Sequence, residues 1–435
     1  MKLINVRLPS FSSDQLFQIK IENGRYELIQ MQDGPVVTTV PKLSELPIEL
    51  IAETGEINVE GRVLLPSFVD VHTHLDKAYS LPAVPNRSGT LVEAIENYSA
   101  KAATFTHDEI KERVRRAAIQ SLHHGTAYIR THVNFELDIS EELALSNLQA
   151  VLEVKEELSP MMSLQVVPMF SKLSTRTKRE LEVIEEAISY GVDGIGGAPH
   201  LSAEANADLD VLFELAGKNN KWLDLHVDEQ DNPEVRTISY IIDKTRELGY
   251  QGRVFAGHLC SLSAMDELTA MAIIEGMKQE KIGAITLPGA NLYLQGREDK
   301  GIVRRGITRV KDLVAAGVSV AAASDNVHDP FHPFGRCDLL QIGLLTAYTA
   351  HLAGEKEIHE VLRMITEVPG AFFGLENYGI KEGADASFTI LDADNLYDGF
   401  ARLSPTRYLF HQGQWTSVMR SESQLLCSEK PQLRV

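Results

Sequence analysis

Residues 71–77 read Val71-His72-Thr73-His74-Leu75-Asp76-Lys77 and close a short apolar run of the chain. Two histidines separated by one residue point to the same side of an extended strand, because side chains there alternate with a period of two. Both imidazoles could therefore bind one metal ion, whose other ligands must come from elsewhere in the chain. Three further apolar runs of strand length end in comparable residues, at Leu225-His226, Gly257-His258 and Ser324-Asp325. This pattern predicts a metal-dependent hydrolase.

The 71–77 stretch belongs to a long alternation of predicted strands and helices. The clearest helix begins at Thr106, where Glu109 completes a capping box, and it ends at Gly125. Eight strands are expected, at residues 63–72, 127–131, 164–169, 194–197, 222–226, 253–258, 282–287 and 318–323. Eight strands alternating with helices predict an α/β fold, a (β/α)₈ barrel of the TIM type. In that fold catalytic groups lie at the carboxyl ends of the strands, where the candidate histidines and Asp325 also fall.

The two ends of the chain differ from this alternation. Residues 18–22 alternate apolar and polar side chains before an Asn23-Gly24 turn, and residues 384–391 read as another strand. We expect both ends to form one small β-sandwich domain, which suits a chain of 435 residues. The expected limits are 1–62 and 376–435 for the two parts of this domain, and 63–375 for the hydrolase barrel.

Composition and charge argue against several other classes of protein. The net charge of −19 repels phosphate backbones, so nucleic-acid binding is not expected. No apolar stretch reaches the length of a membrane span, and the first residues lack a signal-peptide core, so we expect a cytoplasmic protein without membrane partners. Cys260, Cys337 and Cys427 are too few and too scattered for a disulfide framework. An inert, buried Cys260 is favoured over a catalytic thiol.

The residues at the strand ends suggest separate chemical roles. A neutral His226 imidazole is a good ligand for zinc or iron, and Glu229 could receive and return protons beside that metal. His258 could hydrogen-bond the attacking water or the oxyanion. Asp325 could bind the metal and take a proton from its water. A structural histidine or a turn aspartate is the competing interpretation for His258 and Asp325.

The sequence resembles the cytosine deaminase-like group of the amidohydrolase superfamily over nearly its whole length. The segments that carry this resemblance, beyond residues 72–77, are 88–91, 130–133, 152–155, 226–229, 294–297, 304–311 and 378–380. The resemblance implies that His72, His74, His226 and Asp325 are metal ligands, and that Glu229 and His258 handle protons. It also implies one divalent metal ion, iron or zinc, because residues 194–198 lack the lysine that dinuclear relatives use. Homo-oligomers are common in this group.

Four residues are the predicted substrate contacts: Phe170, Ser171, Asn326 and Phe331. Ser171 stands near the place where cytosine deaminases have a glutamine, Asn326 replaces a second aspartate, and Phe331 replaces a tryptophan. Serine lacks the reach and the paired donor and acceptor of glutamine, so cytosine itself is disfavoured. The triplet at 324–326 instead resembles N-isopropylammelide isopropylaminohydrolase, which lacks the glutamate that matches Glu229.

These observations predict a metal-dependent hydrolytic deaminase of an amino-substituted nitrogen heterocycle, a cytosine-like pyrimidine or a related ring. The metal lowers the pKa of its bound water, and the resulting hydroxide attacks the ring carbon that bears the amino group. One alternative is removal of a substituted amine from a triazine-like ring. A cyclic amidase is less favoured because the fourth strand carries no lysine. A scaffold without activity is disfavoured because all six metal and proton-handling residues are intact.

Overall fold

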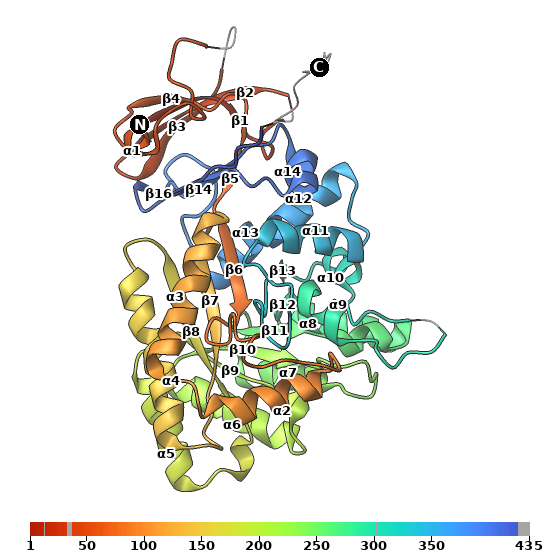
Figure 1. Cartoon of the computed structure of the whole chain (residues 1–435). Helices are drawn as coiled ribbons and strands as arrows, with labels where there is room; N and C mark the ends of the chain where they lie inside the picture. The colour runs from red at the N-terminus through yellow and green to blue at the C-terminus, as the bar shows by residue number, and fades with distance from the viewer. Residues whose placement is uncertain (13, 33–36, 302, 425–435) are drawn as a thin grey trace.

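A computed structural model describes residues 1–12, 14–32, 37–301 and 303–424, and it shows a barrel of parallel strands joined to a second sheet (Figure 1). Eight strands pair in chain order: β6 (Phe68–Thr73), β7 (Thr126–Asn134), β8 (Ser163–Phe170), β9 (Gly194–Gly197), β10 (Trp222–Val227), β11 (Val254–His258), β12 (Gly283–Thr286) and β13 (Val320–Ala322). A single parallel bridge between Thr73 and Asp325 brings the last strand beside the first. The predicted (β/α)₈ barrel is therefore confirmed, as a nearly closed one.

Helices follow the barrel strands and cover the outside of the barrel (Figure 1). The longer ones are α2 (Leu91–Ala102), α3 (His107–His123), α4 (Glu141–Leu158), α5 (Lys178–Ser189), α6 (Ala205–Lys218), α7 (Thr237–Leu248), α8 (Glu267–Gln279), α11 (Leu339–Thr349) and α12 (Glu355–Met364). The shorter ones are α1 (Ile48–Ile51), α9 (Pro288–Leu294), α10 (Val310–Ala316), α13 (Glu367–Phe373) and α14 (Leu396–Arg402), with 3₁₀ turns η1 (Leu173–Thr175), η2 (Pro199–Leu201) and η3 (Cys260–Ala264).

The capping box predicted for the helix after Thr106 is present at the start of α3. The Thr106 hydroxyl accepts a hydrogen bond from the Glu109 amide at 3.2 Å, and the Glu109 carboxylate accepts one from the Thr106 amide at 2.8 Å. These bonds satisfy amide groups that have no partner inside the helix. The apolar positions Ile110, Val114 and Ala118 then face the barrel and are buried.

Both ends of the chain contribute to the second sheet, as predicted. Its strands are β1 (Lys2–Arg7), β2 (Leu16–Glu22), β3 (Arg25–Met31), β4 (Glu56–Asn58), β5 (Val63–Pro66), β14 (Phe388–Leu391), β15 (Arg407–His411) and β16 (Gln414–Met419). They pair in the order β16-β15-β14-β5-β1-β2-β3, and β4 also pairs with β1. The sheet is mixed, since β5 runs antiparallel to β14 but parallel to β1. Its own core contains Leu3, Ile19 and Phe388.

The strand expected at 63–72 is in fact two strands in different sheets. Residues of β5 pair with β14, whereas β6 pairs with β7 in the barrel, and Ser67 separates the two strands. Pro66 lacks an amide hydrogen and cannot continue a ladder beyond this point. The chain changes sheets here, which places the second sheet at the amino end of the barrel strands (Figure 1). The predicted domain limits stay predictions.

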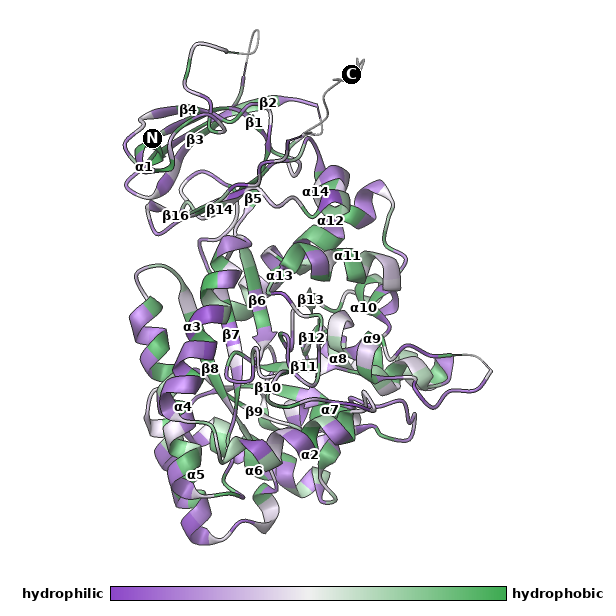
Figure 2. Cartoon of the chain, in the orientation of Figure 1, coloured by the Kyte–Doolittle hydropathy of each residue, from purple (hydrophilic) through white to green (hydrophobic). Residues whose placement is uncertain are grey.

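Hydropathy follows the layers of the molecule. Figure 2 shows green, apolar ribbon along much of β6 and alternating green and purple along the covering helices. The barrel core includes Val69, Val71, Ile129 and Leu225, which are fully buried. None of the helices in the described ranges combines the length and apolar character needed to cross a membrane.

Candidate metal centre and substrate cavity

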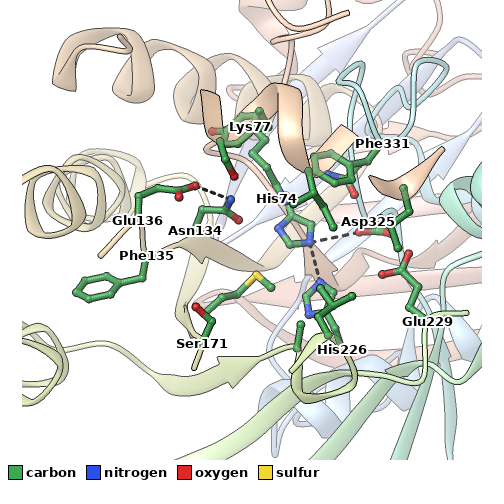
Figure 3. Close-up of a pocket in the computed structure, with 18 of the residues that line it drawn as sticks. His74, Lys77, Asn134, Phe135, Glu136, Ser171, His226, Glu229, Asp325 and Phe331 are labelled. Atoms are coloured by element: carbon green, nitrogen blue, oxygen red, sulfur yellow. Dashed lines mark hydrogen bonds and ion pairs between the residues drawn. The ribbon is translucent and has the colours of Figure 1, made fainter. Parts of the chain in front are cut away.

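Three histidine rings converge at the carboxyl ends of β6 and β10. The Nε2 atom of His226 lies 3.2 Å from Nε2 of His72 and 3.0 Å from Nε2 of His74. Asp325, which follows β13, brings Oδ1 to 3.4 Å from Nε2 of His74 (Figure 3). One potential ligand atom from each of these four residues lies within 4.8 Å of the other three, and all four residues are buried. The predicted ligand set is therefore assembled in one place.

This donor set fits a divalent metal ion. Three ring nitrogens face one another, although a hydrogen bond at each contact needs one donor and one acceptor. Oδ1 of Asp325 is buried and has no hydrogen-bond partner among the described residues. Burial lowers the pKa of His72, His74 and His226, which favours the neutral imidazole that binds metals. Imidazole and carboxylate ligands suit both zinc and iron.

Backbone contacts fix Asp325 beside β6. Its amide donates to the carbonyl of His72 at 2.9 Å, and its own carbonyl accepts from the His74 amide at 3.2 Å and from the Thr73 hydroxyl at 2.7 Å. Asp325 adopts a φ of 58°, a left-handed conformation that is uncommon outside glycine. Burial raises the pKa of its carboxyl group to about 6. The residue is thus held in an unusual conformation that aims its side chain at the histidines.

The predicted proton-handling pair lies next to the ligands. Oε1 of Glu229 is 3.4 Å from Nδ1 of His258, and the Asn291 side-chain nitrogen is 3.0 Å from the same Nδ1. The neighbouring Asp228 turns away and caps α7, accepting from the Thr237 amide at 2.9 Å. Burial, and then the negative charge of Asp325, raise the pKa of Glu229 well above its ordinary value. Glu229 can therefore carry a proton near neutral pH.

The sequence did not indicate a second layer of contacts behind His72. Oδ1 of Asp224 lies 3.5 Å from Nδ1 of His72 and 3.4 Å from Nε2 of His132, and Oδ2 accepts from Arg130 at 2.7 Å. Burial opposes ionisation of Asp224, but His132, His72 and Arg130 together hold its pKa below the ordinary value. A carboxylate in this position orients the His72 ring. The one available signal was that Asp224 shares a strand face with His226.

All four predicted substrate contacts line a cavity beside the histidines. Phe170 is buried at its wall, Ser171 lies exposed at its rim, and Asn326 and Phe331 come from the segment after β13. The Asn326 amide donates to Asp329 at 2.7 Å, which fixes its orientation. The cavity has a volume of about 210 Å³ and is also lined by His258. Its lining further includes His74, His226, Glu229 and Asp325 (Figure 3).

The same cavity is lined by residues that sequence reasoning did not assign to the site. They include Lys77, Tyr98, Asn134, Glu136 and Met169. Asn134 ends β7 and Glu136 follows it, so the strand-end rule could have found both. Tyr98 lies on α2, and neither its position nor its spacing marks it in the sequence.

The cysteines and the fourth barrel strand were both considered in the sequence. Cys260 is buried, and burial raises the pKa of its thiol well above the ordinary value, which disfavours a reactive thiolate. Cys427 lies outside the described residues. The fourth barrel strand, β9, reads Gly-Ile-Gly-Gly and offers no lysine for a second metal ion.

Comparison with known proteins places this geometry in a family. The sequence model of the amidohydrolase family matches residues 103–414. The chain belongs to the amidohydrolase family. Its histidine-rich cluster is accordingly the metal-binding site of an amidohydrolase, a hydrolase of carbon–nitrogen bonds.

Two curated amidohydrolase relatives cover most of the chain. The N-isopropylammelide isopropyl amidohydrolase of Pseudomonas sp. (strain ADP) is 32% identical over 352 residues, which cover 78% of this chain and 82% of the relative. The pterin deaminase of Rhizobium rhizogenes (strain K84) is 29% identical over 366 residues, covering 83% of this chain and 82% of the relative.

The fold is also similar to a solved structure with a bound ligand. The 5-methylcytosine deaminase of Klebsiella pneumoniae, liganded with 5-fluorocytosine, superposes with a TM-score of 0.87 at 28% identity. The match covers 98% of this chain and 99% of that one. The predicted resemblance to cytosine deaminase-like amidohydrolases is thereby confirmed.

Proposed function

We propose that this amidohydrolase is a hydrolytic deaminase of an amino-substituted nitrogen heterocycle and works with one divalent ion, iron or zinc. The observation that carries the proposal is the Glu229–His258 pair, at 3.4 Å, beside four convergent metal-ligand candidates in one cavity. A metal-binding scaffold would not require a buried carboxyl group with a raised pKa at this position. The similarity to deaminases of a pterin and of 5-methylcytosine supports a flat heterocyclic substrate.

The chain supplies the proton transfers that this reaction needs. A bound divalent ion would activate water for attack on the amino-bearing ring carbon. Nε2 of His258 is buried without a hydrogen-bond partner among the described residues and is free to orient that water, and the Asp325 carboxylate beside the ion would accept its proton. Glu229 protonates the neighbouring ring nitrogen and then assists protonation of the exocyclic nitrogen. Ammonia leaves, and the ring keeps the oxygen as an oxo group.

The cavity wall favours a second candidate, hydrolytic removal of a substituted amine. Leu91 and Ile95 of α2 and Leu201 of η2 line the cavity and are partly exposed, so they lie at its mouth. These apolar side chains could pack against an alkyl group on the departing nitrogen. The relative of 32% identity is named for an isopropyl-bearing substrate, in agreement with this alternative.

Identification of the leaving group tests the proposal and separates the two candidates. Metal-loaded protein is incubated with amino-substituted pyrimidines, purines, pterins and triazines, with and without N-alkyl groups. Ammonia is measured enzymatically and alkylamines by mass spectrometry. We expect ammonia from at least one unsubstituted amino heterocycle. Alkylamine release alone would favour the second candidate. Neither product from any compound, with metal bound, would contradict both.

We also expect a cytoplasmic homo-oligomer that binds neither nucleic acid nor membranes. The net charge of −19 supports this expectation because an acidic surface repels phosphates. Light scattering on the purified protein measures the oligomeric state. Binding assays at low salt with labelled DNA and RNA, and with anionic vesicles, test whether the protein binds nucleic acid or membranes. We expect no binding in either assay.

A further inference from the structure

Lys77 places a positive charge inside the cavity. It lies in the turn that follows β6, three residues after His74, and only 4% of its surface is exposed. Its side chain lines the cavity beside Phe331 (Figure 3). Among the described residues that line the cavity, Lys77 is the sole lysine or arginine.

The Lys77 ammonium group has no hydrogen-bond acceptor in the described part of the protein. Its nitrogen lies 4.5 Å from the centre of the Phe331 ring and 5.9 Å from that of Tyr98. Aromatic faces attract a cation but do not satisfy its three N–H donors as oxygen acceptors would. The group forms no salt bridge within 4.0 Å with any carboxylate of the described residues. Because Lys77 lines the cavity and the protein offers its ammonium group no acceptor, an atom of a bound ligand is the natural acceptor.

Nearby acidic side chains accept hydrogen bonds from donors other than Lys77, although Oδ1 of Asp76 has no partner among the described residues. Asp76 accepts a hydrogen bond from the Asn134 amide at 2.9 Å, and Glu136 accepts one from the Asn134 side chain at 3.0 Å. Asp329 accepts from Asn326 at 2.7 Å. These bonds turn carboxylate oxygens toward other donors, and none of the three carboxylates comes within 4.0 Å of the Lys77 nitrogen, which leaves the ammonium group available to a ligand.

We propose, building on the proposed function, that Lys77 selects heterocycles with an oxo group on a ring atom other than the reacting carbon. The ammonium group would donate a charge-assisted hydrogen bond to that oxygen, or to its anionic enolate form. A larger anion such as a phosphate does not suit the cavity, because Glu136, Glu229 and Asp325 also line it and Phe170 and Met169 are apolar. Substrates without the oxygen would leave the ammonium unpaired and bind more weakly.

Matched pairs of ligands test the role of Lys77. Cytosine is compared with 4-aminopyrimidine, and pterin with 2-aminopteridine, so that each pair differs in the oxo group. Dissociation constants are measured by calorimetry with zinc-loaded wild type, Lys77→Met and Lys77→Arg, each also carrying Glu229→Gln so that no compound is turned over during the titration. For at least one pair we expect Lys77→Met to weaken binding of the oxo member by about tenfold or more, and binding of the other member by less than about threefold. Lys77→Arg should retain part of the preference because it retains the charge.

A control variant separates ligand recognition from a general effect of charge or folding. Lys101→Met removes a lysine from α2 outside the cavity. It should leave the dissociation constants of both members of each pair unchanged. Thermal unfolding and zinc content are checked for every variant, and Lys77→Gln replaces Lys77→Met if the latter does not fold.

The remaining outcomes distinguish a failure of the role assigned to Lys77 from a failure of the proposed deamination. Equal weakening of both members of a pair would overturn the inference, since Lys77 would then act on the site as a whole. Failure of wild type to bind any oxo member would overturn it too. Ammonia release is followed separately. Binding that depends on both the oxygen and Lys77, but without any ammonia, would contradict the proposed deamination and leave the assignment of Lys77 intact.

Discussion

Glu229 combines two properties that a general acid and base requires. It is 6% exposed, and its carboxylate lies 3.4 Å from the His258 ring, so a proton can pass within a protected site. Burial and the charge of Asp325 raise its pKa, which brings the acid form into the working pH range. A carboxyl group at the protein surface would be almost fully ionised at neutral pH and could not donate.

Replacement of this carboxyl group tests the proton transfer. We expect Glu229→Gln to lower kcat by about 10²-fold or more, because the amide cannot exchange a proton at this position. Metal content and thermal unfolding should stay close to those of wild type. Glu234→Gln, in an exposed position of the same loop, is the matched control and should keep full activity. Unchanged turnover by Glu229→Gln would rule out the assigned role.

His411 predicts a pH effect on stability that is independent of catalysis. Its ring is buried in the second sheet, Nδ1 lies 2.8 Å from the Ser387 hydroxyl, and burial lowers its pKa to about 4. The unfolded chain binds a proton with a pKa near 6.5, so the folded state binds fewer protons between these values. Stability contributed by neutral His411 is therefore present above about pH 6.5 and is lost as the pH falls toward 4.

We expect His411→Asn to reduce the acid sensitivity of the fold. Between pH 7 and pH 5, wild type should lose about 2 kcal/mol more of its free energy of unfolding than the variant does. Unfolding in urea at both pH values measures the difference. His351→Asn, at an exposed position with a φ of 54° that asparagine tolerates, is the control. Equal acid sensitivity of His411→Asn and wild type would contradict the expectation.

Sequence reasoning worked best for residues whose direction follows from the strand. His72 and His226 lie at strand ends, and period-two alternation together with the strand-end rule was sufficient to bring them together. Lys77 lies in a turn, where no periodicity gives the direction of a side chain. Asp224 could be placed on a strand face, but its partners Arg130 and His132 are distant in sequence and depend on the pairing of separate strands.

At the scale of elements, local signals predicted the elements themselves better than their partners. The capping box at Thr106 identified α3 because both of its hydrogen bonds are made within four residues. The division of residues 63–72 between two sheets was missed, although Pro66 was visible. Pairing of β5 with β14 joins segments more than 300 residues apart, and no local pattern specifies such a partner.

A buried ion pair links the second sheet to the helices that cover the barrel. Arg407 of β15 donates to both oxygens of Asp338, at 2.8 and 2.9 Å, and to the carbonyl of His124 at 2.7 Å. Asp338 also caps α11 by accepting from the Leu340 amide at 3.1 Å. Both charged side chains are almost fully buried, and the half-exposed Arg336 adds only a longer contact of 3.5 Å to Asp338, so Arg407 is the principal partner of this carboxylate.

Removal of one member of this pair should therefore be costly. We expect Arg407→Met to lower the free energy of unfolding by about 3–5 kcal/mol, because the carboxylate of Asp338 stays buried without its principal partner and keeps only the longer contact with Arg336. Arg402→Met, on α14, breaks an ion pair with Asp398 in which half of the Arg402 side chain is exposed, and should cost about 1 kcal/mol or less. Thermal unfolding of the two variants makes the comparison. Similar melting temperatures would contradict a structural role for the buried pair.

At the scale of the whole molecule, the two ends of the barrel have different surroundings, and one of them holds the cavity for a small ligand. The second sheet packs against the amino ends of the strands, whereas the cavity lies at their carboxyl ends (Figure 1). The barrel could be predicted because its eight strands alternate regularly with helices. The substrate could not, because the shape of the cavity combines residues of α2, β8 and the segment after β13 that meet only in the folded chain.

Titration of metal-free protein with metal tests the central claim most directly. Chelated and dialysed protein receives increasing amounts of Zn²⁺ or Fe²⁺, and turnover of the best substrate from the panel is measured against metal bound per chain. We predict no turnover without metal, a linear rise, and saturation at one equivalent, with His226→Ala showing neither tight binding nor turnover. Full turnover by the metal-free protein, or saturation only at two equivalents, would contradict a mononuclear metal-dependent hydrolase.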